Sequence, residues 1–303
     1  MTRVLVAGAL VLAACGEVQA VGDVRGVLFG IAAVTSTSDD ATQEAAMLAI
    51  EAKTARHFDL DRIYHQWDTA IPGAREQWTI AQARTPIVSF KASGDAPWPA
   101  IAAGLHDREL AAIAAGFAAL RVPVFAIFDQ DPENSGGALG TPADYRAAYR
   151  RVVDVFRTSA ADNVVWIFNL KSPSFADLAE AYYPGDDAID WIGASVYNFG
   201  IASGGRWVSF ADLITDYLVW ATPHGKPMII TEWASNEDPA IAGRKAAWID
   251  AAAATVHATP QLRALSGFWS QGEDKAFDSS DSALAAFRAF AADPYTHLRD
   301  TPH

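Results

Sequence analysis

The stretch Lys226-Pro-Met-Ile-Ile-Thr-Glu-Trp233 is a short apolar and β-branched run that follows a proline and ends beside an acid. Such a run is typical of a parallel strand that is covered on both faces. Glu232 therefore stands at the end of a buried strand next to an indole, where an ionised carboxylate costs free energy unless something pairs with it. From this stretch alone, Glu232 is either a functional carboxylate or a strand-end acid in a solvated loop.

The rest of the chain repeats this pattern, because short β-branched or aromatic runs alternate with longer alanine-rich helical patterns. The eight predicted strands are 27–34, 58–67, 85–91, 123–129, 163–170, 188–197, 226–233 and 264–270. The predicted helices are 42–56, 73–84, 108–121, 142–159, 210–221, 241–257 and 282–292. The connection after the fifth strand is short and loop-like.

Eight strands that alternate with helices predict a parallel α/β fold, and at this length a closed (β/α)8 TIM barrel formed by one domain, residues 26–303. An open doubly wound sheet is the alternative, but it normally carries a Gly-rich phosphate loop after an early strand, and the sequence has none.

The helix at 142–159 has its own start signal. Thr141 is the predicted N-cap and Pro142 suits the first helical position. The Asp144 side chain can bond back to the Thr141 backbone N–H, as in a capping box.

The first 14 residues form a positive start and an apolar run too short to span a bilayer, which is typical of a secretory signal. The run ends in Leu12-Ala13-Ala14-Cys15-Gly16, which resembles the bacterial lipobox. The resemblance implies cleavage before Cys15, lipid attachment at that residue, a tether over 15–25, and export to the cell envelope with an anchor in the membrane. A secretory signal with an incidental cysteine is the alternative.

The composition excludes several functions. The formal net charge of −13 argues against nucleic acid as a partner. Cys15 is the only cysteine, so no internal disulfide can form, and no Cys/His cluster has the spacing of a zinc site. We therefore expect no metal, no cofactor and a monomer.

In a (β/α)8 barrel the active site lies at the carboxyl ends of the strands. Acids lie at the ends of the fourth and seventh predicted strands, and aromatic residues lie at the ends of the second, sixth, seventh and eighth. A retaining glycosidase needs such a set, because one carboxylate attacks the anomeric carbon, a second protonates the leaving oxygen, and aromatic faces hold sugar rings. Tyr197, at the end of the sixth strand, could donate a hydrogen bond to Glu232.

Four segments of the sequence are distinctive: Tyr182-Tyr-Pro-Gly-Asp-Asp187, Ile189-Asp-Trp-Ile-Gly193, Tyr197-Asn198 and Pro227-Met-Ile-Ile-Thr-Glu-Trp233. Through them the chain resembles glycoside hydrolase family 26, the β-mannanase-like family, over residues 27 to 293. The resemblance implies a retaining (β/α)8 hydrolase of β-linked polysaccharides, chiefly β-1,4-mannans, with some members acting on xylans or mixed-linkage glucans. It implies that Glu232 is the nucleophile and that Tyr197 is the tyrosine bonded to it.

The chain departs from the family after the fourth strand. Family members carry His-Glu there, the Glu being the general acid, whereas this chain has Gln130-Asp131, followed by Pro132 and Glu133. Shortening Glu to Asp withdraws the carboxyl by roughly 1.5 Å. Three outcomes are open: Asp131 acts as the acid/base, Glu133 replaces it, or the protein is a catalytically impaired surface lipoprotein that binds polysaccharide without cutting it.

Aromatic and histidine side chains near the strand ends are candidates for binding sugar. Trp269, at the end of the eighth strand, is predicted to form the floor of the subsite for the cleaved sugar. The other candidates are His65, Trp67, Trp98 and Trp233. For Trp67 and Trp98, packing in the core is the alternative.

Overall fold

The computed structural model describes residues 26–37, 39–67, 69–135, 137–201 and 204–298. Its eight strands pair in parallel with their neighbours in the chain, and β8 pairs with β1 over seven residues, so the sheet closes into a barrel. The open-sheet alternative is therefore excluded. The strands are β1 Leu28–Val34, β2 Leu60–Gln66, β3 Thr85–Lys91, β4 Val124–Phe128, β5 Val164–Lys171, β6 Trp191–Asn198, β7 Met228–Ser235 and β8 Leu262–Ser270.

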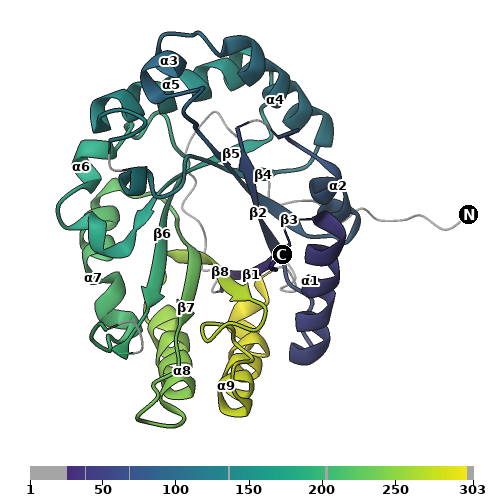
Figure 1. Cartoon of the computed structure of the whole chain (residues 1–303), viewed down its shortest axis with the longest axis vertical. Helices are drawn as coiled ribbons and strands as arrows, with labels where there is room; N and C mark the ends of the chain where they lie inside the picture. Colours follow the sequence, from purple (N-terminus) through teal and green to yellow (C-terminus); the bar gives the residue numbers. More distant parts are fainter. Residues whose placement is uncertain (1–25, 38, 68, 136, 202–203, 299–303) are drawn as a thin grey trace, which may run out of the picture.

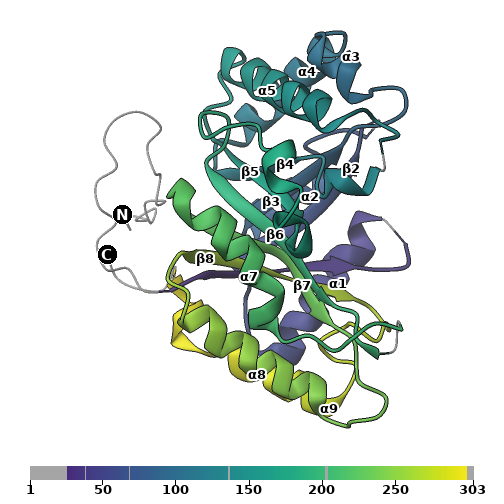
Figure 2. The same ribbon diagram turned by 90° about the vertical axis from the view of Figure 1, so that its left-hand side faces the viewer.

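Helices surround the barrel, as Figure 1 and the rotated view in Figure 2 show. They are α1 Asp40–Thr54, α2 Ala74–Ala81, α3 Trp98–Ala102, α4 Asp107–Leu120, α5 Pro142–Thr158, α6 Ala179–Tyr182, α7 Phe210–Ala221, α8 Arg244–His257 and α9 Asp281–Ala291. The short connection predicted after the fifth strand is confirmed. It consists of the 3-10 turn η2 Ser172–Phe175 and the single helical turn α6.

Helix α5 begins as its sequence predicts. The Thr141 hydroxyl accepts a hydrogen bond from the Asp144 backbone N–H, and the Asp144 carboxylate accepts one from the Thr141 N–H, with Pro142 at the first helical position. The two bonds satisfy backbone donors that otherwise lack partners at a helix start. The buried face of α5, which includes Tyr145, Tyr149 and Phe156, then packs on the barrel.

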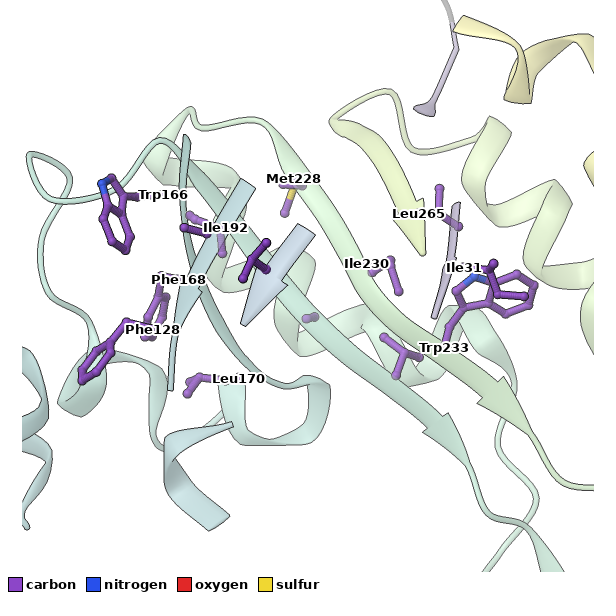
Figure 3. Packing of buried hydrophobic residues seen from close by; sticks show 14 of the residues in the cluster. Ile31, Phe128, Trp166, Phe168, Leu170, Ile192, Met228, Ile230, Trp233 and Leu265 are labelled. Atoms are coloured by element: carbon purple, nitrogen blue, oxygen red, sulfur yellow. The ribbon is translucent and has the colours of Figure 1, made fainter. Parts of the chain in front are cut away.

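Side chains divide between the inside and the outside of the barrel with the strand period of two. An inner cluster fills the amino-terminal half of the barrel and includes Leu60, Ile127, Ile167 and Ile229. The larger outer cluster lies between the strands and the helices. Figure 3 shows part of this outer layer, including Ile31, Phe128, Phe168, Ile230, Trp233 and Leu265.

The alternation is interrupted once on β7, at the residue before Glu232. Ala194 of β6 is the register partner of Ile230, but the next residue, Ser195, is the partner of Glu232, so Thr231 is an extra residue that forms a β-bulge. Without the bulge Glu232 would share the outward face of Ile230. The bulge instead places Glu232 on the inner face with Ser195, which is a known use of bulges near functional sites.

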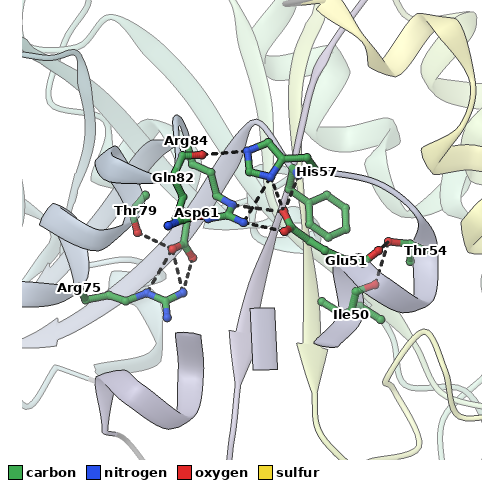
Figure 4. A network of polar contacts seen from close by, with 10 residues as sticks. Ile50, Glu51, Thr54, His57, Asp61, Arg75, Thr79, Gln82 and Arg84 are labelled. Atoms are coloured by element: carbon green, nitrogen blue, oxygen red, sulfur yellow. Dashed lines mark hydrogen bonds and ion pairs between the residues drawn. The ribbon is translucent and has the colours of Figure 1, made fainter. Parts of the chain in front are cut away.

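On the outer side of the barrel, charged side chains connect β2 to α2 and the residue before β3 to α1 (Figure 4). Asp61 accepts hydrogen bonds from the Arg75 guanidinium, at 2.8 and 3.1 Å, and from the Thr79 hydroxyl. Arg84 forms an ion pair of 2.7 Å with Glu51 of α1. Because the carboxylates and guanidinium groups are buried together with partners, each charge is compensated and fixes the position of a helix.

The predicted secretory signal, Cys15 and the 15–25 tether lie outside the described residues. Within the residues that are described, no helix combines the length and the apolar character needed to cross a membrane.

Candidate active site

Glu232 lies at the inner face of β7 and is only 4% exposed. Its Oε2 accepts a hydrogen bond of 2.6 Å from the Tyr197 hydroxyl, the bond expected from the sequence. Its Oε1 accepts bonds of 2.9 Å from the Tyr64 hydroxyl and from Gln130 Nε2. With both oxygens bonded to fixed donors, the carboxylate is held in one orientation.

A buried cation lies beside this carboxylate. Nη2 of Arg62, on β2, is 3.4 Å from Oε1 of Glu232 and donates a 2.7 Å hydrogen bond to Gln130 Oε1. The Arg62 side chain has no solvent exposure. A buried carboxylate is costly when alone, and the guanidinium supplies the compensating charge. Gln130 bridges the two groups, because it accepts from Arg62 and donates to Glu232.

Asp131, after β4, is buried and lies across β6 from Glu232. Its Oδ1 accepts hydrogen bonds from Asn169 Nδ2, at 2.8 Å, and from the Ser195 hydroxyl, at 3.0 Å. Ser195 is also the strand partner of Glu232. Burial, and after it the negative charges of Glu232 and Glu133, raises the pKa of Asp131 to about 8. The group therefore carries a proton at neutral pH, as a general acid requires.

The loop that carries Gln130 and Asp131 has an unusual backbone. Asp129 and Asp131 both adopt the left-handed region, with φ of 51° and 48°. Aspartate tolerates this region better than most residues, yet two such residues flanking Gln130 are uncommon. The turn brings Gln130 to Glu232 and Asp131 to Asn169. The Asp129 carboxylate instead accepts a hydrogen bond from the Trp98 indole N–H. Burial raises the pKa of Asp129 to about 6.

Glu133, the alternative acid, is tied to β5. Its Oε1 accepts a 2.8 Å hydrogen bond from the backbone N–H of Lys171. It lies in the 3-10 turn η1 Pro132–Ser135, so its bond joins the β4 loop to the end of β5. In this arrangement Glu133 holds the β4 loop against the end of β5, whereas Asp131 is the acid bonded to Asn169 and Ser195 inside the barrel.

Two of the predicted sugar-binding tryptophans are core residues, and this corrects the sequence prediction. Trp98 has no exposed surface and packs edge-on against Tyr145, with ring centroids 5.3 Å apart. Trp233 also has no exposed surface. The centroid of its ring lies 4.8 Å from that of Phe277 and 6.0 Å from that of Trp248. Because Glu232 faces inward, its neighbour Trp233 faces the helices.

The predictions for Trp269 and His65 were wrong for the same reason, namely strand alternation. Both point outward from their strands. Trp269 is 2% exposed, and its indole N–H donates a 2.6 Å hydrogen bond to the Asp278 carboxylate. Nε2 of His65 lies 2.6 Å from Oε1 of Glu76, on α2. The inward residue of β8 at this level is Phe268, whose ring lies 5.8 Å from Tyr197. A shift of one residue along a strand changes the face.

Trp67, the remaining candidate, is partly buried. It packs against the outer cluster and lies edge-on to His106, with ring centroids 5.5 Å apart. No contact places it beside Glu232 or Asp131. Its role in sugar binding stays a prediction.

Several site residues were missed because only strand ends were considered in the sequence. They are Arg62, Tyr64, Asn169, Ser195, Thr231 and Phe268, which lie inside strands and face inward. One signal was available for β2. Arg62 and Tyr64 alternate with apolar Ile63 in a strand that the fold covers on both sides, and a buried arginine there needs a carboxylate partner.

The arrangement defines a class of protein. A (β/α)8 barrel holds one ionisable acid at the end of β4 and another near the end of β7, with aromatic hydroxyl groups bonded to the second. A glycoside hydrolase uses two acids at the ends of barrel strands in this way. In the part of the chain that the structure describes, no group of three or more His, Cys, Asp or Glu residues is placed to hold a metal ion.

Comparison with known proteins supports one family within this class. Residues 103–220 match the model of glycosyl hydrolase family 26, a segment that contains Asp131 and Tyr197. Endoglucanase H of Acetivibrio thermocellus is 33% identical over 157 residues, which is 50% of this chain. The match spans only 17% of that relative's length.

Solved structures with this fold include a family 26 β-mannanase from Bacteroides ovatus, with a TM-score of 0.63 and 15% identity over 92% of this chain and 95% of the other. An endo-β-1,4-mannanase of Cellulomonas fimi has a TM-score of 0.64 and 19% identity over 92% of this chain and 74% of the other. At these identities the likeness shows the fold. The family match covers the part of this fold from β4 to α7.

Proposed function

We propose that this protein is a retaining glycoside hydrolase of family 26 that cleaves a β-linked polysaccharide resembling β-1,4-mannan. One observation carries the proposal. Glu232 accepts hydrogen bonds on both oxygens beside a buried arginine, while Asp131, across β6, has its pKa raised to about 8. One acid is thus ready to attack and the other to donate a proton.

In this mechanism Glu232 attacks the anomeric carbon and forms a glycosyl ester, while Asp131 gives its proton to the departing oxygen. Water then attacks the ester, and Asp131, now ionised, removes a proton from that water. Tyr197 and Tyr64 hold the carboxylate in place for attack. Burial raises the pKa of each tyrosine well above the ordinary value for a phenol, so both hydroxyl groups keep their protons and remain hydrogen-bond donors.

Product release from soluble mannan, mixed-linkage glucan and xylan tests the proposal. An activated aryl glycoside needs little protonation of its leaving group, so it reports on Glu232 separately from Asp131. We expect a burst of aryl alcohol that Glu232→Ala abolishes, and a first sugar product that keeps the β configuration by NMR. Absence of turnover on every substrate, or an inverted first product, would refute it.

A binding protein with a degenerate site is the second candidate. The observation that favours it is the replacement of the family His-Glu by Gln130-Asp131, with the Asp131 carboxyl bonded to Asn169 and Ser195. Glycan affinity without turnover, unaffected by Asp131→Ala, is the expected result for a binder. If the double substitution Gln130→His with Asp131→Glu restored turnover, only the general-acid position after β4 would have lost its function.

We also propose that the protein is exported and anchored to the cell envelope through a lipid on Cys15. The support is the lipobox-like Leu12-Ala13-Ala14-Cys15-Gly16 after a short apolar run. Expression in a bacterium with a labelled fatty acid should label the wild-type protein in the membrane fraction. Cys15→Ser should lose the label, and label that persists in this variant would contradict the anchor.

A further inference from the structure

An exposed aromatic ring, that of Phe199, stacks on Tyr197, the tyrosine that is hydrogen-bonded to Glu232. Phe199 is the first residue after β6, two positions beyond Tyr197, so the strand period puts both on the same face. The two rings are stacked, with centroids 5.2 Å apart and planes only 4° from parallel. Phe199 nevertheless keeps 53% of its surface exposed, although one side of its ring lies on Tyr197.

The backbone around this ring is fixed to the end of β7. The side chain of Asn236 donates a 3.0 Å hydrogen bond to the Phe199 carbonyl, and its backbone N–H donates to the Asn198 carbonyl at 2.9 Å. Asn198 in turn donates from Nδ2 to the Ser235 hydroxyl at 2.9 Å. Phe199 is thus held in position before any ligand arrives, which lowers the entropy lost on binding.

The exposure of Phe199 is costly unless a ligand covers it. The ring has no polar atom, and Ile201, two residues further, is 48% exposed, so the apolar surface continues along the loop. Exposed apolar patches with polar residues around them often mark binding sites. The C–H face of a pyranose ring is the partner that matches a flat aromatic surface, while its hydroxyl groups remain in water.

We propose that Phe199 is a stacking platform for a backbone sugar of the polysaccharide, next to the sugar whose anomeric carbon faces Glu232. The site takes a chain of linked pyranose units, because the platform begins beyond Tyr197 and so lies outside the space of the reacting ring. The inference rests on the proposed function for its occupant. Its geometry rests on the Tyr197–Phe199 stack and on the exposure of Phe199.

The test compares Phe199→Ala with the wild-type protein on oligosaccharides of increasing length. We expect KM to rise about 3- to 10-fold for chains long enough to reach the platform, the range for loss of one aromatic contact. The KM for the shortest cleaved substrate should rise much less than the KM for long chains. Phe199→Trp should restore the wild-type KM, and Val219→Ala, at a residue of α7 that is 70% exposed, is the matched control that should change nothing.

Calorimetric binding in a Glu232→Gln background provides a readout without turnover. Adding Phe199→Ala should weaken the affinity for long glucomannan or mixed-linkage glucan oligosaccharides by the same factor. An unchanged affinity and KM for long chains would overturn the platform, even if Glu232→Ala still abolished activity. An equal loss at all lengths would also overturn it. If the wild-type protein neither cuts nor binds glycan, the proposed function itself fails.

Discussion

The surroundings of Asp131 change the titration of its carboxyl in the direction that acid catalysis would require. Its carboxyl is buried, lies near two other acids, and accepts bonds from Asn169 and Ser195. The donors favour the ionised form, but burial and the neighbouring charges outweigh them and raise the pKa to about 8. An aspartate on the surface, with a pKa of about 4, would be ionised and unable to protonate a leaving oxygen at neutral pH.

We predict that kcat/KM for polysaccharide falls as the pH rises through about 8, because Asp131 then loses the proton that it must donate. A pH–rate profile measures this limb. The profile for an activated aryl glycoside should fall much less over the same range, since its leaving group departs without a proton. If both substrates lost activity together, Asp131 would not be the proton donor.

The same titration affects stability. The folded-state pKa of Asp131 is raised from 3.8, so folding stability declines as the pH rises from about 4 to about 8. We predict that Asp131→Asn, which has no such charge, gains stability relative to the wild-type protein across this window, by on the order of a few kcal/mol at the upper end. Thermal unfolding at several pH values measures it, and a difference that does not depend on pH would contradict the buried charge.

Arg62 is the second residue with a decisive environment, because its charge compensates that of Glu232. We predict that Arg62→Met destabilises the protein by about 3–5 kcal/mol, the cost of breaking a buried ion pair. In a Glu232→Gln background the same substitution should cost less, because the neutral amide needs no cation. Chemical denaturation of the four proteins completes the cycle. Equal costs in both backgrounds would mean that Arg62 serves packing alone.

At the scale of single elements, the bulge on β7 is the feature that makes the site. A regular β7 would place Glu232 outward with Ile230 and Met228, in the layer of the helices. The extra residue, Thr231, turns Glu232 inward, and its own hydroxyl donates to Asn169 Oδ1. Asn169 donates to Asp131, so a short chain of hydrogen bonds links the bulge to the acid. The bulge thus aligns both carboxyls.

Helix α5 offers a prediction about an element alone. Its capping box at Thr141 and Asp144 satisfies two backbone donors at the helix start. We predict that Thr141→Ala lowers the free energy of unfolding by about 1 kcal/mol, whereas Thr141→Ser, which keeps the hydroxyl, has little effect. Urea denaturation measures both. A comparable loss in the serine variant would assign the effect to the threonine methyl group instead of the cap.

At the scale of the whole molecule, the closed barrel separates two environments on every strand. Inward residues near the carboxyl ends form the site, and outward residues form the layer under the helices. Trp233 belongs to this layer, where it contacts Phe210, Trp248 and Phe277. The barrel therefore places two adjacent residues on opposite faces, Glu232 in the candidate site and Trp233 in the packed layer under the helices.

This separation predicts opposite effects for two aromatic residues. Trp233→Phe should lower the melting temperature and leave KM unchanged, because the ring never meets substrate. Truncation to alanine would cost about 3–5 kcal/mol by the usual cost of a core cavity. Phe268→Ala, at the inward position beside Tyr197, should raise KM with little change in melting temperature. A raised KM for Trp233→Phe would reverse the assignment of faces.

The sequence by itself determined the eight strands, the closed barrel, the cap of α5 and the pair Glu232–Tyr197, because these depend on local patterns and on strand ends. It did not determine which face each residue takes near the site. That choice depends on the register of neighbouring strands and on the bulge at Thr231. No residue pattern within β7 predicts this bulge. Only the tertiary structure therefore turned Trp98, Trp233, Trp269 and His65 away from the site, and brought Arg62, Tyr64 and Phe268 into it.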